Sequence, residues 1–252
     1  MEDRIQGTVL PVLEIGLQPG ESVVSEAGEF SWMTDTIEMS TGTSGASKGI
    51  FGAIKRVAGG SSLMMSTYTA GAGPGMVAFA AKVPGKILPV DVAPGAEYMV
   101  HRRGFMCGMP GIEISAGFQQ SFRGGIFGGE GFILQKLGGT AKVWVELSGE
   151  VLTYNLAAGQ TMRVHPGHVG MFQVSVSFQV IRTPGLANRY FGEDGHHMAV
   201  MTGPGSVWLQ SMPLPNLAAA LSPYLGGSTS STVTAGAAGG VAGGVLGDLF
   251  GK

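Results

Sequence analysis

The sequence predicts an all-β fold: three tandem β-sandwich repeats of the jelly-roll type, arranged with pseudo-threefold symmetry, and one short amphipathic helix. The 44 glycines and 13 prolines among 252 residues lack a collagen period and disfavour long helices. Short apolar runs are interrupted about every 8–12 residues by Pro-Gly, Gly-Gly or Ala-Gly, as is typical of sandwiches and jelly rolls. The third observation is an internal repeat.

The repeat is visible when glycines are used to align the chain with itself. Residues 85–95 and 149–159 share both terminal glycines and their apolar positions. An earlier copy runs from Leu13 through Ile15, Leu17 and Pro19 to Gly20. Three such units pack most simply around a pseudo-threefold axis, each covering the sheet edges of its neighbours.

Between the glycines, apolar residues alternate with the period of two that a half-buried strand requires. Residues 171–181 are the clearest case and predict a strand with one apolar face. Shorter alternating runs place Val77, Phe79, Ala81 and Val83 on one face of a strand, and Ala141, Val143, Val145 and Leu147 on one face of another.

The repeats and a change in composition predict four segments. The first repeat covers residues 1–74, with a short helix near 48–58, and the second and third cover 75–139 and 140–225. Residues 226–252 are rich in Gly, Ala and Ser, which predicts a flexible tail.

Composition narrows the class of protein. Hydrophobic residues make up 44% of the chain, enough for a packed core, whereas charged residues make up only 13% and the net charge is −2. Such a chain lacks the positive field that attracts nucleic acid, so we expect no nucleic-acid partner. The single Cys107 excludes an intrachain disulfide, and without a signal-like or membrane-spanning segment we expect a cytoplasmic protein.

The motifs of common enzymes are missing from the sequence. There is no Gly-x-Ser-x-Gly elbow and no P-loop lysine beside the glycine clusters. His165 and His168 fall in a predicted turn, and the adjacent His196 and His197 would point to opposite faces of a strand, which disfavours a metal site. We interpret Cys107 as a buried core thiol. The sequence therefore predicts a non-enzyme with no catalytic residue, cofactor or metal.

Two segments near the end of the repeats carry a family resemblance. Residues 190–195 read Tyr-Phe-Gly-Glu-Asp-Gly, and residues 201–211 contain the run Thr-Gly-Pro-Gly followed by Gln-Ser. Residues 17–23, 28–33 and 52–62 fit as well. Together they resemble the family named after the altered-inheritance-of-mitochondria protein, and the residues that carry the resemblance are Gly192, Glu193, Asp194, Thr202, Gly203, Pro204, Gly205 and Gln210.

The resemblance implies β-sandwich repeats with a fold like that of the tryptophan RNA-binding attenuation protein, and no known catalytic activity. In eukaryotic relatives it implies a role in the organisation of the mitochondrial inner membrane. This chain has Asp194 where relatives commonly have glycine. Aspartate is one of the few residues that tolerate left-handed backbone geometry in place of glycine.

Residues 48–57 depart from the β pattern and predict one short basic amphipathic helix. Its apolar face comprises Ile50, Phe51, Ile54 and Val57, flanked by Lys55 and Arg56. Two interpretations stay open: such a helix can lie on a membrane surface, or it can cover the edge of a sandwich. The tail ends in an apolar tip with Leu249 and Phe250, which can dock on a partner, another subunit or a membrane.

These observations together predict a non-enzymatic binding or scaffolding protein. Its expected partner is a second copy of the chain or another protein, with peripheral contact to a membrane as a further option. One alternative is a small-molecule or metal-binding protein. A second alternative is RNA binding, which rests on the fold analogy alone.

Overall fold

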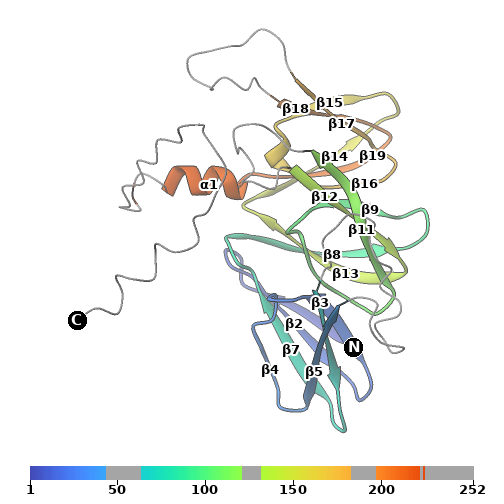
Figure 1. Cartoon of the computed structure of the whole chain (residues 1–252), viewed down its shortest axis with the longest axis vertical. Coiled ribbons are helices and arrows are strands. Elements are labelled where there is room, and N and C mark those ends of the chain that lie inside the picture. The colour runs from blue at the N-terminus through green and yellow to red at the C-terminus, as the bar shows by residue number, and fades with distance from the viewer. Residues whose placement is uncertain (44–63, 121–131, 183–196, 222–223, 225–252) are drawn as a thin grey trace, which may run out of the picture. The chain divides into compact units, whose positions relative to one another are not determined.

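The computed structural model describes residues 1–43, 64–120, 132–182, 197–221 and 224. The chain divides into two compact units, Met1–Ala220 and Leu221–Lys252, and nearly all described residues lie in the first. That unit is almost entirely β structure, which confirms that the fold is all-β (Figure 1).

The described strands are short. In chain order they are β1 (Glu2–Gln6), β2 (Val12–Leu17), β3 (Ser22–Glu26), β4 (Trp32–Met33), β5 (Ile37–Thr43), β6 (Met64–Ala70), β7 (Gly75–Ala80), β8 (Gly85–Val92), β9 (Tyr98–His101), β10 (Phe105–Gly108), β11 (Ile112–Gln120), β12 (Phe132–Gly139), β13 (Ala141–Ser148), β14 (Val151–Leu156), β15 (Thr161–Val164), β16 (Val169–Gln173), β17 (Ser177–Arg182), β18 (His197–Thr202) and β19 (Gly205–Gln210). A 3-10 turn, η2 (Pro166–His168), precedes β16, and helix α1 (Leu214–Leu221) follows β19.

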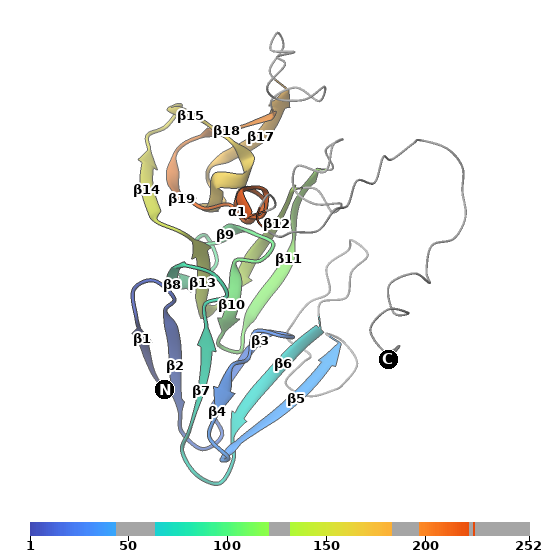
Figure 2. The ribbon, with the colours of Figure 1, turned by 90° about the vertical axis from the view of Figure 1, so that its left-hand side faces the viewer.

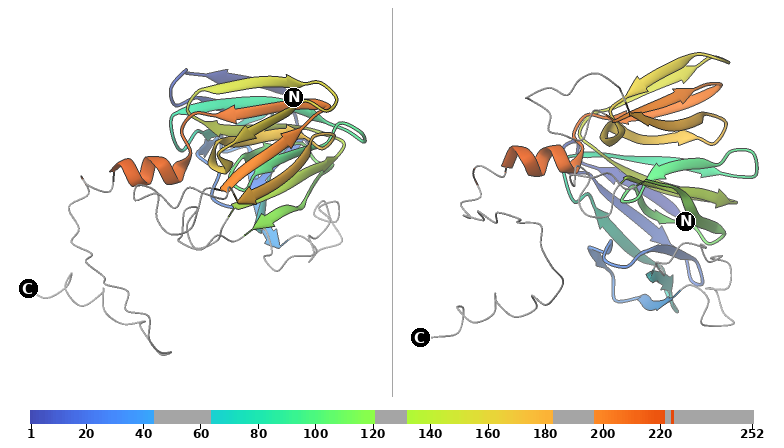
Figure 3. Two further views of the ribbon diagram at one scale, coloured as in Figure 1. Left: turned by 90° about the horizontal axis from the view of Figure 1, so that it is seen from above. Right: turned by 45° about the horizontal axis from the view of Figure 1, so that its top comes forward.

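These strands form antiparallel sheets that lie in layers (Figure 3). One sheet has the order β1-β2-β7-β4, and a second has the order β5-β6-β3-β10-β13-β8. A third runs β11-β12-β9-β16-β19-β14, and the last is β15-β18-β17. Strands distant in sequence therefore share each of the larger sheets.

One pairing scheme appears three times along the chain. Strand β2 pairs with β7, β8 with β13, and β14 with β19. Likewise β3 pairs with β6, β9 with β12, and β15 with β18. On the other side of β7, β13 and β19 lie β4, β10 and β16. We call β2–β7 the first strand set, β8–β13 the second and β14–β19 the third.

The glycines that aligned the sequence with itself occupy equivalent turns in the three sets. Gly20, Gly95 and Gly159 have φ values of 81°, 84° and 78°, and no atom lies within 4 Å of where a Cβ would be. The constraint at these positions is therefore the left-handed backbone and not crowding. This geometry explains why glycine recurs there in the sequence.

Neighbouring strand sets are connected by shared strand pairing, which we call a join. At the first join β10 pairs with β3, so that Cys107 lies opposite Ser25. At the second join β16 pairs with β9, so that Met171 lies opposite Val100. The two joins are equivalent in register relative to Gly20 and Gly95. Neighbouring strand sets are therefore connected in two ways: by the chain itself and by hydrogen-bonded strands that extend one sheet across both sets.

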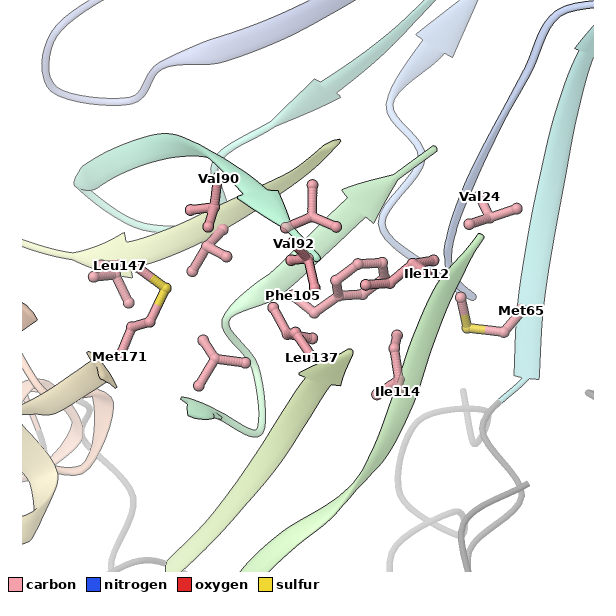
Figure 4. Packing of buried hydrophobic residues seen from close by; sticks show 13 residues of the cluster. Val24, Met65, Val90, Val92, Phe105, Ile112, Ile114, Leu137, Leu147 and Met171 are labelled. Carbon is pink, nitrogen blue, oxygen red and sulfur yellow. The ribbon is translucent and has the colours of Figure 1, made fainter. Parts of the chain in front are cut away.

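The joins bring side chains of one strand set into the core of the preceding one. The first core, built around residues of β2 and β7, also contains Cys107 and Trp144 of the second set. The second core, drawn in Figure 4, contains Met171 of the third set beside Val90, Phe105 and Leu137. Removing one set would therefore leave gaps in the core of its neighbour.

Strand β13 shows what this arrangement demands of a sequence. Val143 and Val145 belong to the second core, while Trp144 between them belongs to the first. All three side chains have 0% exposure. Both faces of the strand are buried here, and the polar residues Glu146 and Ser148, which alternate with Trp144 on the same face, are buried as well.

One expectation changes in the structure. The alternating run at 171–181 is not one strand: β16 ends at Gln173, a turn follows, and β17 begins at Ser177. The turn is closed by a 2.9 Å hydrogen bond from the Val176 amide to the Gln173 carbonyl. β16 pairs with β9 and β19, whereas β17 pairs with β18, so the chain must reverse between different partners.

The pseudo-threefold arrangement stays a prediction. A ring of three sets would need a third join between β15 and β4. In the described ranges β4 pairs with β7 alone and β15 with β18 alone.

Helix α1 was not expected from the sequence. Its eight residues start with Leu214 and Pro215, and proline is favoured in a first helical turn. Among the described residues no helix is long or apolar enough to cross a lipid bilayer. The helix predicted near 48–58 lies outside the described residues.

Candidate interaction surface

The described residues that carry the family resemblance lie in one hairpin. Thr202 ends β18, Gly203 and Pro204 form the turn, and Gly205 and Gln210 bound β19. The Gly203 amide donates to the Gln160 carbonyl at 2.9 Å, and the hydroxyls of Thr202 and Thr161 lie 3.0 Å apart. These contacts attach the hairpin to β15 and the turn before it.

Gln210 connects the second and third strand sets. Its side-chain oxygen accepts a 3.1 Å hydrogen bond from the Ser148 amide at the end of β13. Its amide nitrogen donates to the Gly167 carbonyl at 3.1 Å, and its own carbonyl lies 2.8 Å from Nδ1 of His168. With 6% exposure, Gln210 has no surface to offer a ligand. Its role is to satisfy backbone groups where two strand sets meet.

Asp3 lies on β1, the strand paired with β2, and connects it to the second strand set. Its carboxylate accepts hydrogen bonds from Nζ of Lys142 at 2.6 Å and from Nε1 of Trp144 at 3.2 Å. Burial acts to raise the pKa of Asp3, but the hydrogen bonds from Lys142 and Trp144 outweigh it and lower that pKa below 3.8. The Lys142 ammonium also lies 5.3 Å from the centre of the Trp144 ring.

Two buried carboxyl groups also make contacts between strand sets. Glu146 of β13 accepts a 2.9 Å hydrogen bond from the Lys82 amide, and Glu26 of β3 accepts one of 3.0 Å from the side chain of Gln135. Burial raises the pKa of both glutamates. His101 lies near Glu146, and burial lowers its pKa to about 4, so it is neutral at neutral pH. These groups are placed at the joins and not in an open site.

The histidine turn has the predicted local structure. η2 includes His168, and the rings of His165 and His168 have centroids 5.8 Å apart. Across the part of the chain that the structure describes, no three His, Cys, Asp or Glu side chains come together as a metal site would require. His196 lies outside that part.

Cys107 is a buried core thiol, as the sequence predicts. It has 0% exposure and forms no disulfide. Burial, together with the charges of Glu29 and Asp3, raises its pKa, so the thiol stays protonated and unreactive.

Exposed apolar side chains gather at strand edges. Trp32 of β4 has 45% exposure and Phe30 just before it has 36%. On β14, another edge strand, Leu152 and Tyr154 have 49% and 39%. Because β4 has a neighbour on one side only among the described strands, its other edge offers backbone groups next to an exposed aromatic ring. This edge is the strongest candidate surface on the described residues.

The other predicted interaction residues lie outside the described residues. These are Ile50, Phe51, Ile54, Lys55, Arg56 and Val57 of the amphipathic segment, Leu249 and Phe250 of the tail, and Gly192, Glu193 and Asp194 of the family resemblance.

The geometry defines a class: an all-β protein whose strand sets are connected by buried polar and apolar contacts and whose candidate surface is a strand edge. The chain belongs to the mitochondrial biogenesis AIM24 family, whose model matches residues 4–212. This match confirms the resemblance carried by the residues near 190–211.

Two streptococcal proteins are similar along most of their length. An uncharacterized protein of Streptococcus pyogenes serotype M6, M6_Spy0233, is 24% identical over 240 residues, which cover 89% of this chain and 93% of that protein. The crystal structure of protein SPYM3_0169 from Streptococcus pyogenes superposes with a TM-score of 0.69 at 22% identity, covering 89% of this chain and 99% of that one. At that identity the likeness supports the fold alone.

Sequence reasoning missed the residues that connect the strand sets. Asp3 and Gln135 carry no local motif, because their partners are distant in sequence. Trp32 had a weak signal: it is one of 3 tryptophans, and the other two lie on β13 and β19.

The turn of the hairpin leads to a stability prediction. A Cβ at Gly203 would lie 2.4 Å from the Ala157 carbonyl oxygen and 2.6 Å from that of Leu156. Both are backbone atoms that cannot rotate away, so Gly203→Ala should lower the free energy of unfolding by about 3 kcal/mol. Gly42→Ala is the control, since no atom lies within 4 Å there, and its effect should stay within about 0.5 kcal/mol. Equal denaturation midpoints would contradict the crowding.

The Asp3 contact leads to a pH prediction. Asp3→Asn should lower the free energy of unfolding by about 1 kcal/mol at pH 7, a small effect because the Asp3 and Lys142 side chains keep 22% and 32% exposure. The folded pKa is lowered, so the stabilisation is present above the unfolded pKa and is lost as pH falls through the folded one. Denaturation of both proteins from pH 7 to pH 3 should show the difference disappearing. Glu2→Gln, an exposed change on the same strand, should show no such trend.

Proposed function

We propose that this chain is a non-enzymatic cytoplasmic scaffold that works by binding a second copy of itself. The observation that carries the proposal is where the buried polar groups lie. Asp3, Glu146 and Gln210 all serve contacts between strand sets. The buried polar groups therefore hold the β units together. In this proposal the binding of a partner falls to the surface and the strand edges.

The chemistry of the ionisable groups supports this proposal over an enzyme. A catalytic site needs an accessible nucleophile or base with a pKa suited to its task. Burial raises the pKa of Cys107, and the Glu146 carboxyl accepts a hydrogen bond from a backbone amide. Glu26 accepts one from Gln135. These are properties of structural groups.

We further propose that the three strand sets are tandem repeats of one jelly-roll-like unit. The recurring pairing scheme and the turns at Gly20, Gly95 and Gly159 support this. A protein built by repeating one interface is suited to continuing it with another copy. Contact with a membrane rests on residues outside the described ranges and is not part of the proposal.

Sedimentation velocity on the purified chain tests the proposal. We expect species larger than the 25.8 kDa monomer whose population grows with concentration from about 1 to 200 μM, as mass action requires. Thermal shift against a panel of metal ions and metabolites is the companion measurement. A strict monomer that one compound stabilises would overturn the scaffold in favour of the small-molecule or metal-binding alternative.

A further inference from the structure

We propose that the edge of β4 that has no neighbour among the described strands, with Trp32, pairs with the corresponding edge of β15 in a second copy of the chain. The proposal rests on the self-association proposed above and names its surface, its partner strand and its register. The argument starts from the two joins that the chain already makes with itself.

At each join one strand pairs on both sides. Strand β10 has β13 on one side and β3 of the preceding set on the other, and β16 likewise lies between β19 and β9. The equivalent strand of the first set is β4, which has β7 on one side. The equivalent of β3 and β9 in the third set is β15, which has β18 on one side. The described chain thus ends in the two complementary halves of one more join.

The register identifies the residues that would meet. Cys107 lies opposite both Trp144 and Ser25, and Met171 lies opposite both Trp208 and Val100. In the first set Trp32 holds this position, opposite Ala78 of β7. Ser25 and Val100 lie at the same spacing after the turn glycines of their sets, Gly20 and Gly95. Val164 of β15 lies at that spacing after Gly159. The third join would therefore place Trp32 opposite Val164 of the other copy.

The residues at the equivalent positions on β4, β10 and β16 differ in how far their side chains are exposed. Cys107 and Met171 insert into the core of the preceding strand set and have 0% and 1% exposure. Trp32 has no preceding set among the described residues and has 45% exposure. Met33, the next residue, packs against the first core, as the neighbouring residue Phe172 packs in the third core. The strand is therefore oriented as its equivalents are, with Trp32 facing outward.

Each strand set carries one tryptophan in this layer. Trp144 lies in the first core with 0% exposure, and Trp208 packs against the second core, with its ring 5.9 Å from Tyr98 of the preceding set. In these sets the tryptophan is on β13 or β19 and faces a smaller residue. In the first set the large and small residues have changed places: the tryptophan, Trp32, is on β4, and the small buried residue opposite it, Ala78, is on β7. Trp144 is thus buried and Trp208 is partly buried where strand sets meet, whereas Trp32 is exposed where a further join would form.

The edge of β15 offers a suitable partner. Val164 belongs to the third core, which gains no side chain from a following set. Arg163 is exposed and in the proposed register lies opposite Met33, and the exposed Asp35 lies in the turn that follows β4. These opposite charges would lie on the same side of the contact and attract each other.

The proposed partner is another copy of the chain, because the two edges lie apart within one molecule. Figures 1 and 2 both show β4 near one end of the stack of strand sets and β15 near the other. The two edges differ from each other, so the contact is head-to-tail, the type of interface that generates closed rings or open chains.

A mixed disulfide tests the contact. Trp32→Cys and Val164→Cys are made in separate chains, mixed and oxidised mildly; directly opposed residues have Cβ atoms within reach of a disulfide. We expect a covalent dimer of about twice 25.8 kDa on a non-reducing gel from the mixture and not from either variant alone. Leu152→Cys, also on an exposed edge, mixed with Trp32→Cys is the control and should give none. Cys107 is buried and remains unchanged.

The interface and the proposed function can fail separately. Trp32→Glu should weaken self-association at least about 10-fold, because a central tryptophan is lost, while Leu152→Glu should leave it unchanged. If the wild type associates but Trp32→Glu has no effect and no mixed disulfide forms, the interface is wrong and the scaffold stands. If association is instead lost on deleting residues 226–252, the tail is the contact and the interface is wrong. A wild type that stays monomeric overturns both.

Discussion

The structure depends on strands that belong to two cores at once. β13 places Val143 and Val145 in the second core and Trp144 in the first, with no exposure on either side. Substitutions on such a strand therefore affect two packed layers. Folding of neighbouring strand sets is therefore coupled through packing, because neither set can complete its core alone. The chain behaves as a series of interlocked units and not as separate domains on a string.

This coupling explains why the polar residues inside the protein have structural roles. Where two strand sets meet, some backbone groups lie beyond the end of any pairing strand. Each such group left without a hydrogen-bond partner would cost about 1–3 kcal/mol of folding free energy. Gln210 satisfies groups of Ser148 and Gly167, and Glu146 satisfies the Lys82 amide. Such residues are as restricted in type as catalytic ones. Gln210, which belongs to the run that carries much of the family resemblance, is accounted for by this restriction.

The sequence predicted what local chemistry determines and missed what distant pairing determines. Glycines at 20, 95 and 159 are required by left-handed turns, so their spacing revealed the equivalent positions without any structure. The prediction of a single strand at 171–181 was wrong because the alternation of apolar residues continues through the turn after Gln173. Only the change of partner strand shows where the strand breaks. Asp3 as a partner of Lys142, and the exposure of Trp32, depend on which strand lies alongside. No window of sequence contains that information.

The size of the unpaired edge argues for a reversible contact. β4 has two residues, and the first join inside the chain pairs only two residues of β10 with β3. Backbone pairing at such a join is short, so its strength must come from the side chain that enters the neighbouring core. Burying the remaining exposed surface of one tryptophan contributes on the order of 2–3 kcal/mol. Between copies, that gain must also offset the loss of translational freedom, which is absent within one chain. In the proposed assembly, the contact that is permanent inside the molecule would therefore be weak and concentration-dependent between molecules, a property that suits a scaffold able to assemble and disassemble.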